Sequence, residues 1–106
     1  MVNIEDFAQM ELVVAEIKEA KEHPDADKLY VLKIDTGSGE KQLVAGIRSS
    51  YSVDELVGKK IVVINNLDPA VIRGQESQGM LLAATSEDGP ILLSPDRDVP
   101  AGSRVR

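Results

Sequence analysis

A chain of 106 residues, 42% hydrophobic and 28% charged, has the length of one domain and a composition that excludes the disordered and membrane-spanning classes. With no cysteine and one histidine, it excludes a disulfide framework and a thiolate metal site and argues against histidine-bound zinc. The net charge of −6 argues against indiscriminate nucleic-acid binding, because affinity for phosphate follows the lysines and arginines presented to it.

The N-terminal part of the chain predicts a short helix and then a long strand. Asn3, with Asp6 three residues later, is an N-cap signal for a helix that continues to Met10. Residues 11–22 are ambiguous, because a β-branched cluster is followed by helix-forming residues, but the cluster favours a strand. Residues 23–27, rich in Pro and Asp, then predict a turn.

The next part predicts a hairpin and the clearest helix of the chain. Residues 29–35 alternate as a half-buried strand does, and the glycine-containing turn at 36–39 leads into a paired strand over 41–45. Residues 52–55 match a capping box, and Gly58 stands where a C-terminal cap is expected. One short helix therefore lies between them.

Strands are also expected in the C-terminal part. A continuous apolar strand over 61–67 is broken by Asp68-Pro69, and a loop through Arg73 and Gly74 follows. Further strands are predicted over 80–84 and 91–93, with a turn at 86–89 between them and an irregular tail marked by Pro95, Pro100 and Gly102.

About five strands, with a short helix between the third and the fourth, are the element order of an OB-fold, a small Greek-key barrel. The expected fold class is therefore all-β, a five-stranded barrel with short helices and irregular terminal segments. We expect a single domain over residues 1–106, with the barrel over about 11–94. Because one fold hosts many functions, this order alone names no activity.

Charge is distributed unevenly along the chain. Residues 1–40 hold four basic and ten acidic residues. Residues 41–74 hold five basic and three acidic residues, and residues 75–106 hold three basic and five acidic residues. Only the middle third is basic. A focused basic patch on an acidic body can still bind RNA, because local charge geometry sets the surface potential.

Short motifs occur in a fixed order: HPDADKL (23–29), VAGI (44–47), ELVGKK (55–60), NL (66–67) and ESQGM (76–80). Together they resemble the tRNA-binding domain family found at the C-terminus of methionyl-tRNA synthetases and in related stand-alone tRNA-binding proteins. The resemblance runs from about Ile4 to Val105. It implies an OB-fold, recognition of tRNA shape rather than sequence, and a homodimer whose interface uses the terminal segments 1–10 and 95–106. Apolar residues in those segments, such as Phe7, Met10 and Val99, favour the same dimer.

The predicted tRNA-binding residues come from two sources. The strand assignments place basic side chains for phosphate contacts at Lys33, Lys41, Arg48 and Arg73. The resemblance adds Asn66, Ser77 and Met80, which match family positions near the RNA surface. Each of these three also has a purely structural interpretation: Asn66 caps a strand end, Ser77 bonds within a tight turn, and Met80 fills the core.

Few aromatic residues are available for base stacking, namely Phe7, Tyr30 and Tyr51. RNA binding would then rest on phosphate and 2′-hydroxyl contacts, which read the shape of a folded RNA. Family members commonly carry basic residues at places that here hold Val13, Glu16, Asp68 and Val71. We therefore expect weaker binding, with a shallower salt dependence, than in a basic relative.

Catalytic interpretations fit poorly. Ser77 lies between Gly74 and Gly79, but this spacing is wrong for a nucleophile elbow. The Asp25/Asp27 pair lacks the further ligands of a calcium loop, and no glycine loop suits a phosphate. We expect no catalytic residue, no metal and no cofactor. Because the N-terminus lacks a secretory signal, we expect a cytoplasmic protein that binds neither membrane nor DNA.

Two functions remain open. The first is a non-catalytic tRNA-binding module that assists a methionyl-tRNA synthetase, alone as a dimer or fused to it, by raising the local concentration of RNA. The second is a dimerisation or scaffold element of a synthetase assembly, or a chaperone-like domain that binds polypeptide. The first predicts that the basic residues from Lys41 to Arg73 converge on one face of the barrel.

Overall fold

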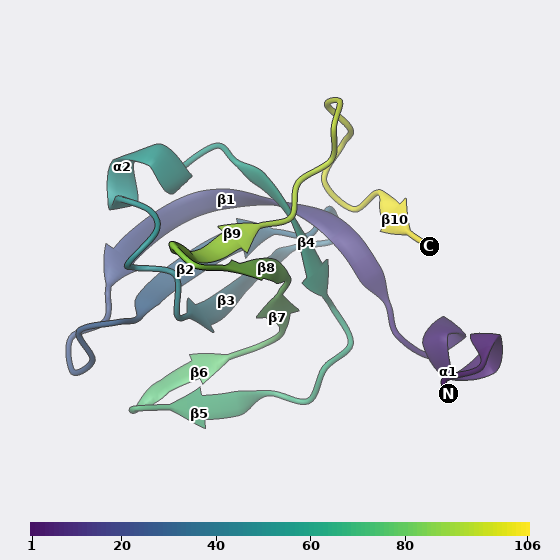
Figure 1. The fold of residues 1–106 in the computed structure, drawn as a ribbon, viewed down its shortest axis with the longest axis horizontal. Helices are drawn as coiled ribbons and strands as arrows, with labels where there is room; N and C mark the ends of the chain where they lie inside the picture. Colours follow the sequence, from purple (N-terminus) through teal and green to yellow (C-terminus); the bar gives the residue numbers. More distant parts are fainter.

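The computed structural model describes all residues, 1–106, and consists mostly of β-strands (Figure 1). Two short helices are present, α1 (Ile4–Ala8) and α2 (Val53–Leu56), and neither has the length to cross a membrane. The strands are β1 (Leu12–Glu22), β2 (Tyr30–Asp35), β3 (Glu40–Ala45), β4 (Lys60–Ile64), β5 (Ala70–Ile72), β6 (Gln75–Ser77), β7 (Met80–Leu81), β8 (Ala83–Ser86), β9 (Gly89–Leu92) and β10 (Arg104–Val105).

The main sheet curls into a barrel whose strands follow the order β3-β2-β1-β4-β7, each antiparallel to its neighbour. Between β3 and β7 the barrel is completed by Gln78, whose N–H donates to the Gln42 carbonyl at 2.8 Å. The Gln78 side-chain oxygen accepts from the Gln42 N–H, also at 2.8 Å. The predicted all-β OB-fold is confirmed, as a nearly closed barrel with α2 between β3 and β4.

The long strand β1 serves both halves of the barrel. Its first half pairs with β4, from Leu12 opposite Ile64, and its second half pairs with β2, to Glu22 opposite Tyr30. The register shifts between Ile17 and Glu19, so Lys18 is the extra residue of a β-bulge, which bends a strand and increases its twist. The strand interpretation of the ambiguous residues 11–22 is thereby confirmed.

The core forms from side chains that alternate toward the barrel interior, as the period of two in a strand requires. Leu56 of α2 is fully buried and packs into the same cluster. The buried cluster comprises Val13, Ala15, Ile17, Tyr30, Leu32, Ile34, Leu43, Ala45, Ile47, Leu56, Ile61, Val63 and Leu92.

Both helices begin at the caps that the sequence predicts. The Asn3 side chain accepts from the Asp6 N–H at 2.9 Å and so satisfies a donor in the first turn of α1. In α2 the Glu55 carboxylate accepts from the Ser52 N–H at 2.7 Å, as a capping box requires. Gly58 follows with φ 92°, a left-handed conformation that favours glycine after a helix.

The prediction of an irregular loop through residues 73 and 74 is wrong. These two residues form the turn of a hairpin in which β5 pairs with β6 and Ile72 lies opposite Gln75. Arg73 (φ 53°) and Gly74 (φ 86°) both adopt the left-handed conformation that a type I′ hairpin turn needs. Arginine seldom adopts it, so the sequence did not carry the usual Asn-Gly signal for this turn.

The tail is also more regular than predicted. Residues 104 and 105 form β10, which pairs with the start of β1 through Leu12 opposite Val105. Just before it, the Val14 N–H donates to the Ser103 carbonyl at 2.8 Å and the Gly102 N–H donates to the Val14 carbonyl at 2.7 Å. The tail therefore pairs with the first residues of β1, before the stretch of β1 that pairs with β2.

Three strand boundaries differ from the predictions by more than one residue, and the smallest of these differences is in β9, predicted over 91–93, which begins at Gly89. The apolar strand predicted over 61–67 ends at Ile64, because the chain turns toward the β5–β6 hairpin. The strand predicted over 80–84 is divided at Leu82 into β7, which completes the barrel, and β8, which pairs with β9 outside it.

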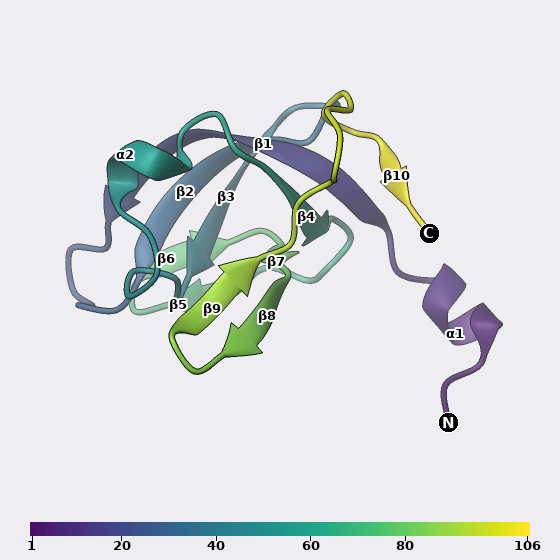
Figure 2. The ribbon, with the colours of Figure 1, turned by 45° about the horizontal axis from the view of Figure 1, so that its top comes forward.

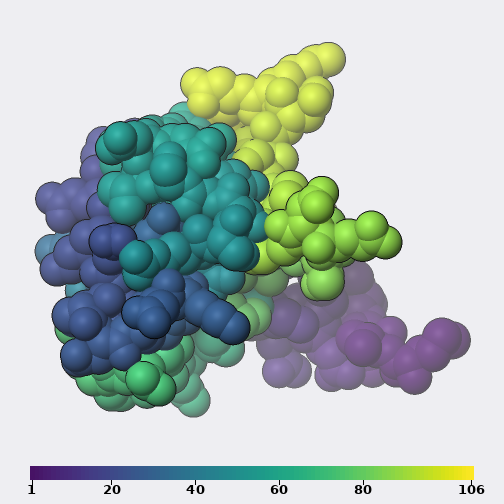
Figure 3. Space-filling model, turned by 60° about the vertical axis from the view of Figure 1, so that its left-hand side comes forward, coloured from purple at the N-terminus to yellow at the C-terminus, as the bar shows by residue number.

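Three segments project from the barrel. Figure 2 shows α1 and the N-terminus standing away from it on the side of β10, with the β8–β9 hairpin at a separate position. In the space-filling view the C-terminal tail, the β8–β9 hairpin and α1 form three separate protrusions (Figure 3). No residue of α1 is buried.

Candidate nucleic-acid interface

The outer face of β1, β2 and β3 carries a group of lysines. Lys33 of β2 lies opposite Glu19 of β1 and opposite Gln42 of β3, so these side chains share one face. Lys21 lies on this face as well, opposite Val31. These residues, with Lys18 at the bulge, line a hollow of about 340 Å³.

Lys41 lies beside this group at the end of the barrel, although it stands opposite the buried Ile34 and so alternates away from the face of Lys33 and Gln42. Its ammonium donates to the Asn65 carbonyl at 2.7 Å, and it lines a second hollow together with Lys33, Gln42 and Gln78. We call Lys18, Lys21, Lys33 and Lys41 the lysine patch. Lys18 and Lys21 are absent from the sequence prediction, because only the bulge and the strand register place them beside Lys33.

Carboxylates accompany the lysine patch and reduce its potential. The Glu16 carboxylate lies 3.4 Å from the Lys18 ammonium, and Glu19 lies across from Lys33. Glu40 lines the hollow next to Lys41. The patch is thus a local concentration of lysines on an acidic protein, which predicts weak and salt-sensitive attraction for phosphate.

The two predicted arginines already make contacts within the chain. Arg48 forms an ion pair with Glu22, and its guanidinium lies 5.9 Å from the centre of the Tyr30 ring. Arg73, at the turn of the β5–β6 hairpin, donates to the Asp25 carbonyl at 3.0 Å. Neither lines the hollows that hold the lysine patch.

Ser77 and Met80 lie together in a different place, an apolar groove of about 370 Å³ between the end of β3 and the segment that carries the β5–β6 hairpin. The groove is lined by Val44, Ala45, Gly46, Leu67, Asp68, Ala70, Ile72, Ser77, Gly79, Met80 and Leu81, and Asp68 is its only charged residue. Met80 is 48% exposed, so it does not fill the core. We call this region the apolar groove.

Ser77 and Asn66 make the structural contacts that their alternative interpretations require. Ser77 is buried, and its hydroxyl accepts from the Val44 N–H at 3.1 Å and donates to the Gly79 carbonyl at 3.0 Å. The Asn66 side chain accepts from the Glu11 N–H and donates to the Gln9 carbonyl, both at 2.8 Å. These contacts dock the hairpin and the N-terminal segment.

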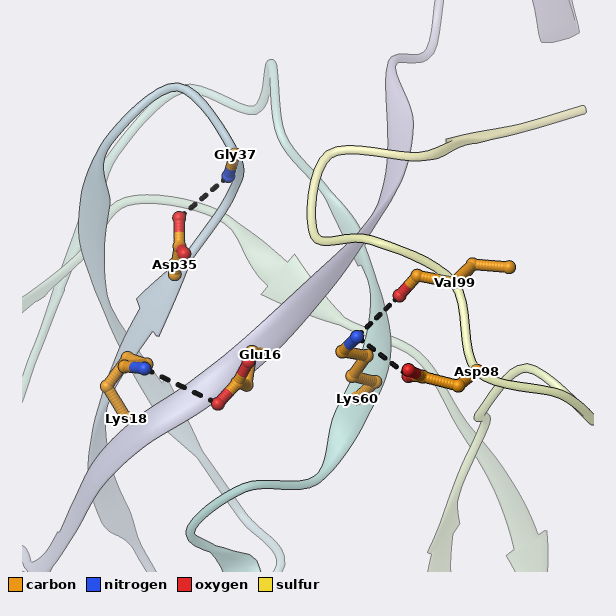
Figure 4. A network of polar contacts seen from close by, with 7 residues as sticks. All are labelled: Glu16, Lys18, Asp35, Gly37, Lys60, Asp98 and Val99. Atoms are coloured by element: carbon orange, nitrogen blue, oxygen red, sulfur yellow. Dashed lines mark hydrogen bonds and ion pairs between the residues drawn. The ribbon is translucent and has the colours of Figure 1, made fainter.

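The expectation that the basic residues from Lys41 to Arg73 converge on one face is wrong. Figure 4 shows the Lys60 ammonium held by the C-terminal segment, 2.7 Å from the Asp98 carboxylate and 2.6 Å from the Val99 carbonyl. The Lys59 ammonium lies 5.8 Å from the centre of the Tyr51 ring. Each basic residue is placed by its own local contact, which a count of charges along the sequence does not register.

The four positions at which the resemblance leads us to expect basic residues in relatives lie in different surroundings. Val13 is buried in the barrel core, so a charge there would face the interior rather than RNA. Glu16 lies beside Lys18 at the edge of the lysine patch, and Asp68 lines the apolar groove. Val71, on the β5–β6 hairpin, is 73% exposed.

Comparison with known proteins identifies the family. The family described as "Putative tRNA binding domain" matches residues 12–104, which include every strand of the barrel. The chain belongs to this family. The resemblance found in the sequence motifs is confirmed.

Named relatives come from two groups. The methionine–tRNA ligase of Thermococcus onnurineus is 49% identical over 99% of this chain, which covers 14% of the ligase. The crystal structure of a MetRS-related protein from Pyrococcus horikoshii, 36% identical, superposes with a TM-score of 0.92 over 100% of this chain and 98% of that one. The crystal structure of the CsaA chaperone protein from Picrophilus torridus, 35% identical, superposes with a TM-score of 0.94 over 100% of this chain and 100% of that one. The chain thus spans about one-seventh of the curated ligases it matches.

Proposed function

We propose that the chain is a non-catalytic tRNA-binding module that recognises the shape of tRNA and assists a methionyl-tRNA synthetase in the cytoplasm. The basic residues from Lys41 to Arg73 do not converge on one face, so that expected support is missing, and the observation that carries the proposal is instead the position of the lysine patch. In an OB-fold the outer face of strands 2 and 3 is where oligonucleotides bind, and Lys33 lies on that face of β2. Lys41 of β3 lies opposite the buried Ile34 and donates to the Asn65 carbonyl, so it borders this face at the end of the barrel. Family membership and the ligase relatives support the choice of tRNA among oligonucleotides.

The chemistry of this face suits the backbone of a folded RNA. Lysine ammoniums pair with phosphates as point charges and carry no sequence information. Base stacking contributes little, because Tyr30 is buried and donates its hydroxyl to the Tyr51 carbonyl at 2.7 Å. Binding would therefore follow the spacing of phosphates on the tRNA surface.

We further propose that the protein is a homodimer through its terminal segments, residues 1–10 and 95–106. Ile4, Phe7, Met10 and Val105 line a hollow of about 330 Å³ between α1 and β10. Ile4 is 71% exposed and Met10 is 41% exposed, so a second copy would cover apolar surface here. Sedimentation of the protein at micromolar concentration tests this, and a monomer would contradict it.

A second candidate function is binding of polypeptide. The observation that favours it is the apolar groove, in which Leu67 and Met80 are exposed by 44% and 48% and only one residue is charged. The likeness to CsaA chaperone structures supports this alternative. A polypeptide bound here would compete with tRNA only if the two sites overlap.

The test is fluorescence anisotropy of a labelled tRNA titrated with the protein at several salt concentrations, with single-stranded RNA and duplex DNA as competitors. We expect preference for tRNA and affinity that falls with salt. The double variant Lys33→Ala/Lys41→Ala should bind about tenfold more weakly with a shallower salt slope. The matched control is Lys59→Ala, which removes a positive charge outside both the lysine patch and the terminal segments, where the ammonium lies 5.8 Å from the centre of the Tyr51 ring. No binding by the wild type at low salt would refute the proposal.

A further inference from the structure

His23 is the only histidine, and it is buried although most of its loop is exposed. Both ring nitrogens have partners. The Asp25 N–H donates to Nδ1 at 2.9 Å, and Nε2 lies 3.1 Å from the Ile72 carbonyl oxygen. Because Nδ1 accepts, the neutral ring carries its proton on Nε2, which donates to Ile72.

The bond to Ile72 joins two segments that lie far apart in the sequence. His23 begins the loop 23–29 between β1 and β2, which is closed by the His23 N–H donating to the Leu29 carbonyl at 3.1 Å. Ile72 ends β5, one residue before the hairpin turn. In Figure 3 the blue residues of the loop lie against the green hairpin.

A second contact crosses the same junction. Arg73 donates to the Asp25 carbonyl at 3.0 Å, while the Asp25 N–H is held by His23. The turn end of the hairpin is therefore fixed to the 23–29 loop by a closed set of hydrogen bonds through His23, Asp25, Ile72 and Arg73. At its other end the hairpin is fixed to β3, where Ser77 accepts from the Val44 N–H.

The two segments joined in this way correspond to the loops that border the binding face of an OB-fold, one between strands 1 and 2 and one between strands 4 and 5. Here the second loop contains the β5–β6 hairpin. Fixing both before RNA arrives lowers the entropy lost on binding, so affinity rises without an added RNA contact.

We infer that His23 is a positioning residue: it couples the 23–29 loop to the β5–β6 hairpin so that the two present one preformed border to the RNA-binding face. The consequence for RNA rests on the proposed function. In this role His23 is buried, bonds to main-chain groups through both ring nitrogens and contacts no phosphate.

Two substitutions of His23 distinguish its bond to Ile72, which couples the two segments, from its bond to the Asp25 N–H, which lies within the 23–29 loop. His23→Asn keeps a short acceptor for the Asp25 N–H but cannot reach Ile72, whereas His23→Gln has the length to donate to Ile72. We expect the amides of β5 and β6 to exchange about tenfold faster in His23→Asn, relative to those of β2, and His23→Gln to restore protection. Nitrogen NMR should show the Nε2–H tautomer in the wild type. Unchanged hairpin exchange in His23→Asn, or the Nδ1–H tautomer, would overturn the inference.

The tRNA titration gives a second readout. His23→Asn should weaken binding about tenfold and leave the salt slope unchanged, because no phosphate contact is lost, and His23→Gln should bind nearly as the wild type does. A shallower slope or an unchanged affinity in His23→Asn would contradict positioning. If the wild type binds no tRNA, the proposed function fails, and the exchange comparison on the free protein still decides whether His23 couples the two segments.

Discussion

The barrel strands and the β5–β6 hairpin are held in place by different interactions. The barrel is held by continuous main-chain ladders around fully buried side chains such as Ile17, Leu32 and Leu43. The hairpin is joined to the rest of the molecule by individual polar contacts, from Ser77 to β3 and from His23 to the hairpin. It also leaves apolar side chains exposed.

Because of this difference, the barrel core should determine the stability of the protein, whereas the polar contacts should determine how the candidate binding surface is arranged. A fully buried aliphatic side chain contributes several kcal/mol, whereas one hydrogen bond contributes about 1 kcal/mol. Segments held by a few polar contacts open more easily than a packed core, and binding sites are commonly built from such segments. Substitutions in the two regions should therefore differ in both size and kind of effect.

The largest effect is expected in the barrel. Leu32→Ala should lower the free energy of unfolding by about 3 kcal/mol, because Leu32 is fully buried in the core cluster and its truncation leaves a cavity. Urea denaturation followed by circular dichroism measures this. Arg97→Ala should stay within about 0.5 kcal/mol of the wild type. If any hairpin variant lost more free energy of unfolding than Leu32→Ala does, the expected difference between the barrel and the hairpin would be contradicted.

An intermediate effect is expected where the hairpin docks. Ser77→Ala should cost about 2 kcal/mol, because it leaves the half-buried N–H of Val44 without its acceptor. The same denaturation experiment applies, with the exposed Ser49→Ala as the matched control. Hydrogen exchange should rise more in β6 than in β2. Equal stability of the Ser77 and Ser49 variants would show that this contact does not hold the hairpin.

A smaller effect is expected at the N-terminal segment. Asn66→Ala removes two hydrogen bonds, to Glu11 and to Gln9, at an exposed position where water replaces part of what is lost. We expect a cost of about 1 kcal/mol. Amide exchange in α1 should increase while the barrel amides keep their protection. If α1 exchanges as in the wild type, the Asn66 contacts do not position it.

The smallest effect on stability is expected for the lysine patch. Lys33→Ala replaces an exposed side chain and should change the free energy of unfolding by less than about 0.5 kcal/mol. Its affinity for tRNA should nevertheless fall, with a shallower salt slope. If Lys33→Ala lowered both the free energy of unfolding and the affinity for tRNA, the prediction that the lysine patch contributes to binding but not to stability would be contradicted.

The elements set by local patterns could be predicted from the sequence. Alternation over 29–35, the capping box at 52–55 and the Asn3 cap each depend on neighbours a few residues away, and each is confirmed. The β5–β6 hairpin was missed because its turn places Arg73 in a conformation that arginine seldom adopts. β10 was missed because its partner lies at the opposite end of the chain.

The candidate site was less predictable, because residue type does not reveal which contacts a side chain already makes. Ser77 and Asn66 have the polar groups of a binding site, yet both hydrogen-bond to main-chain groups of this chain. Lys18 and Lys21 join Lys33 only because a bulge and a strand register bring them together. Their roles in tRNA binding remain predictions.

The pairing of β1 with β10 has a consequence for how the protein folds. β1 pairs with β2, the next strand along the chain, but also with β4 and with β10, and the last pairing joins residues 12 and 105. Closing so long a loop costs conformational entropy before any contact compensates for it, and non-local pairing of this kind slows folding. During synthesis the first strand of the barrel would therefore be the last to acquire all its partners.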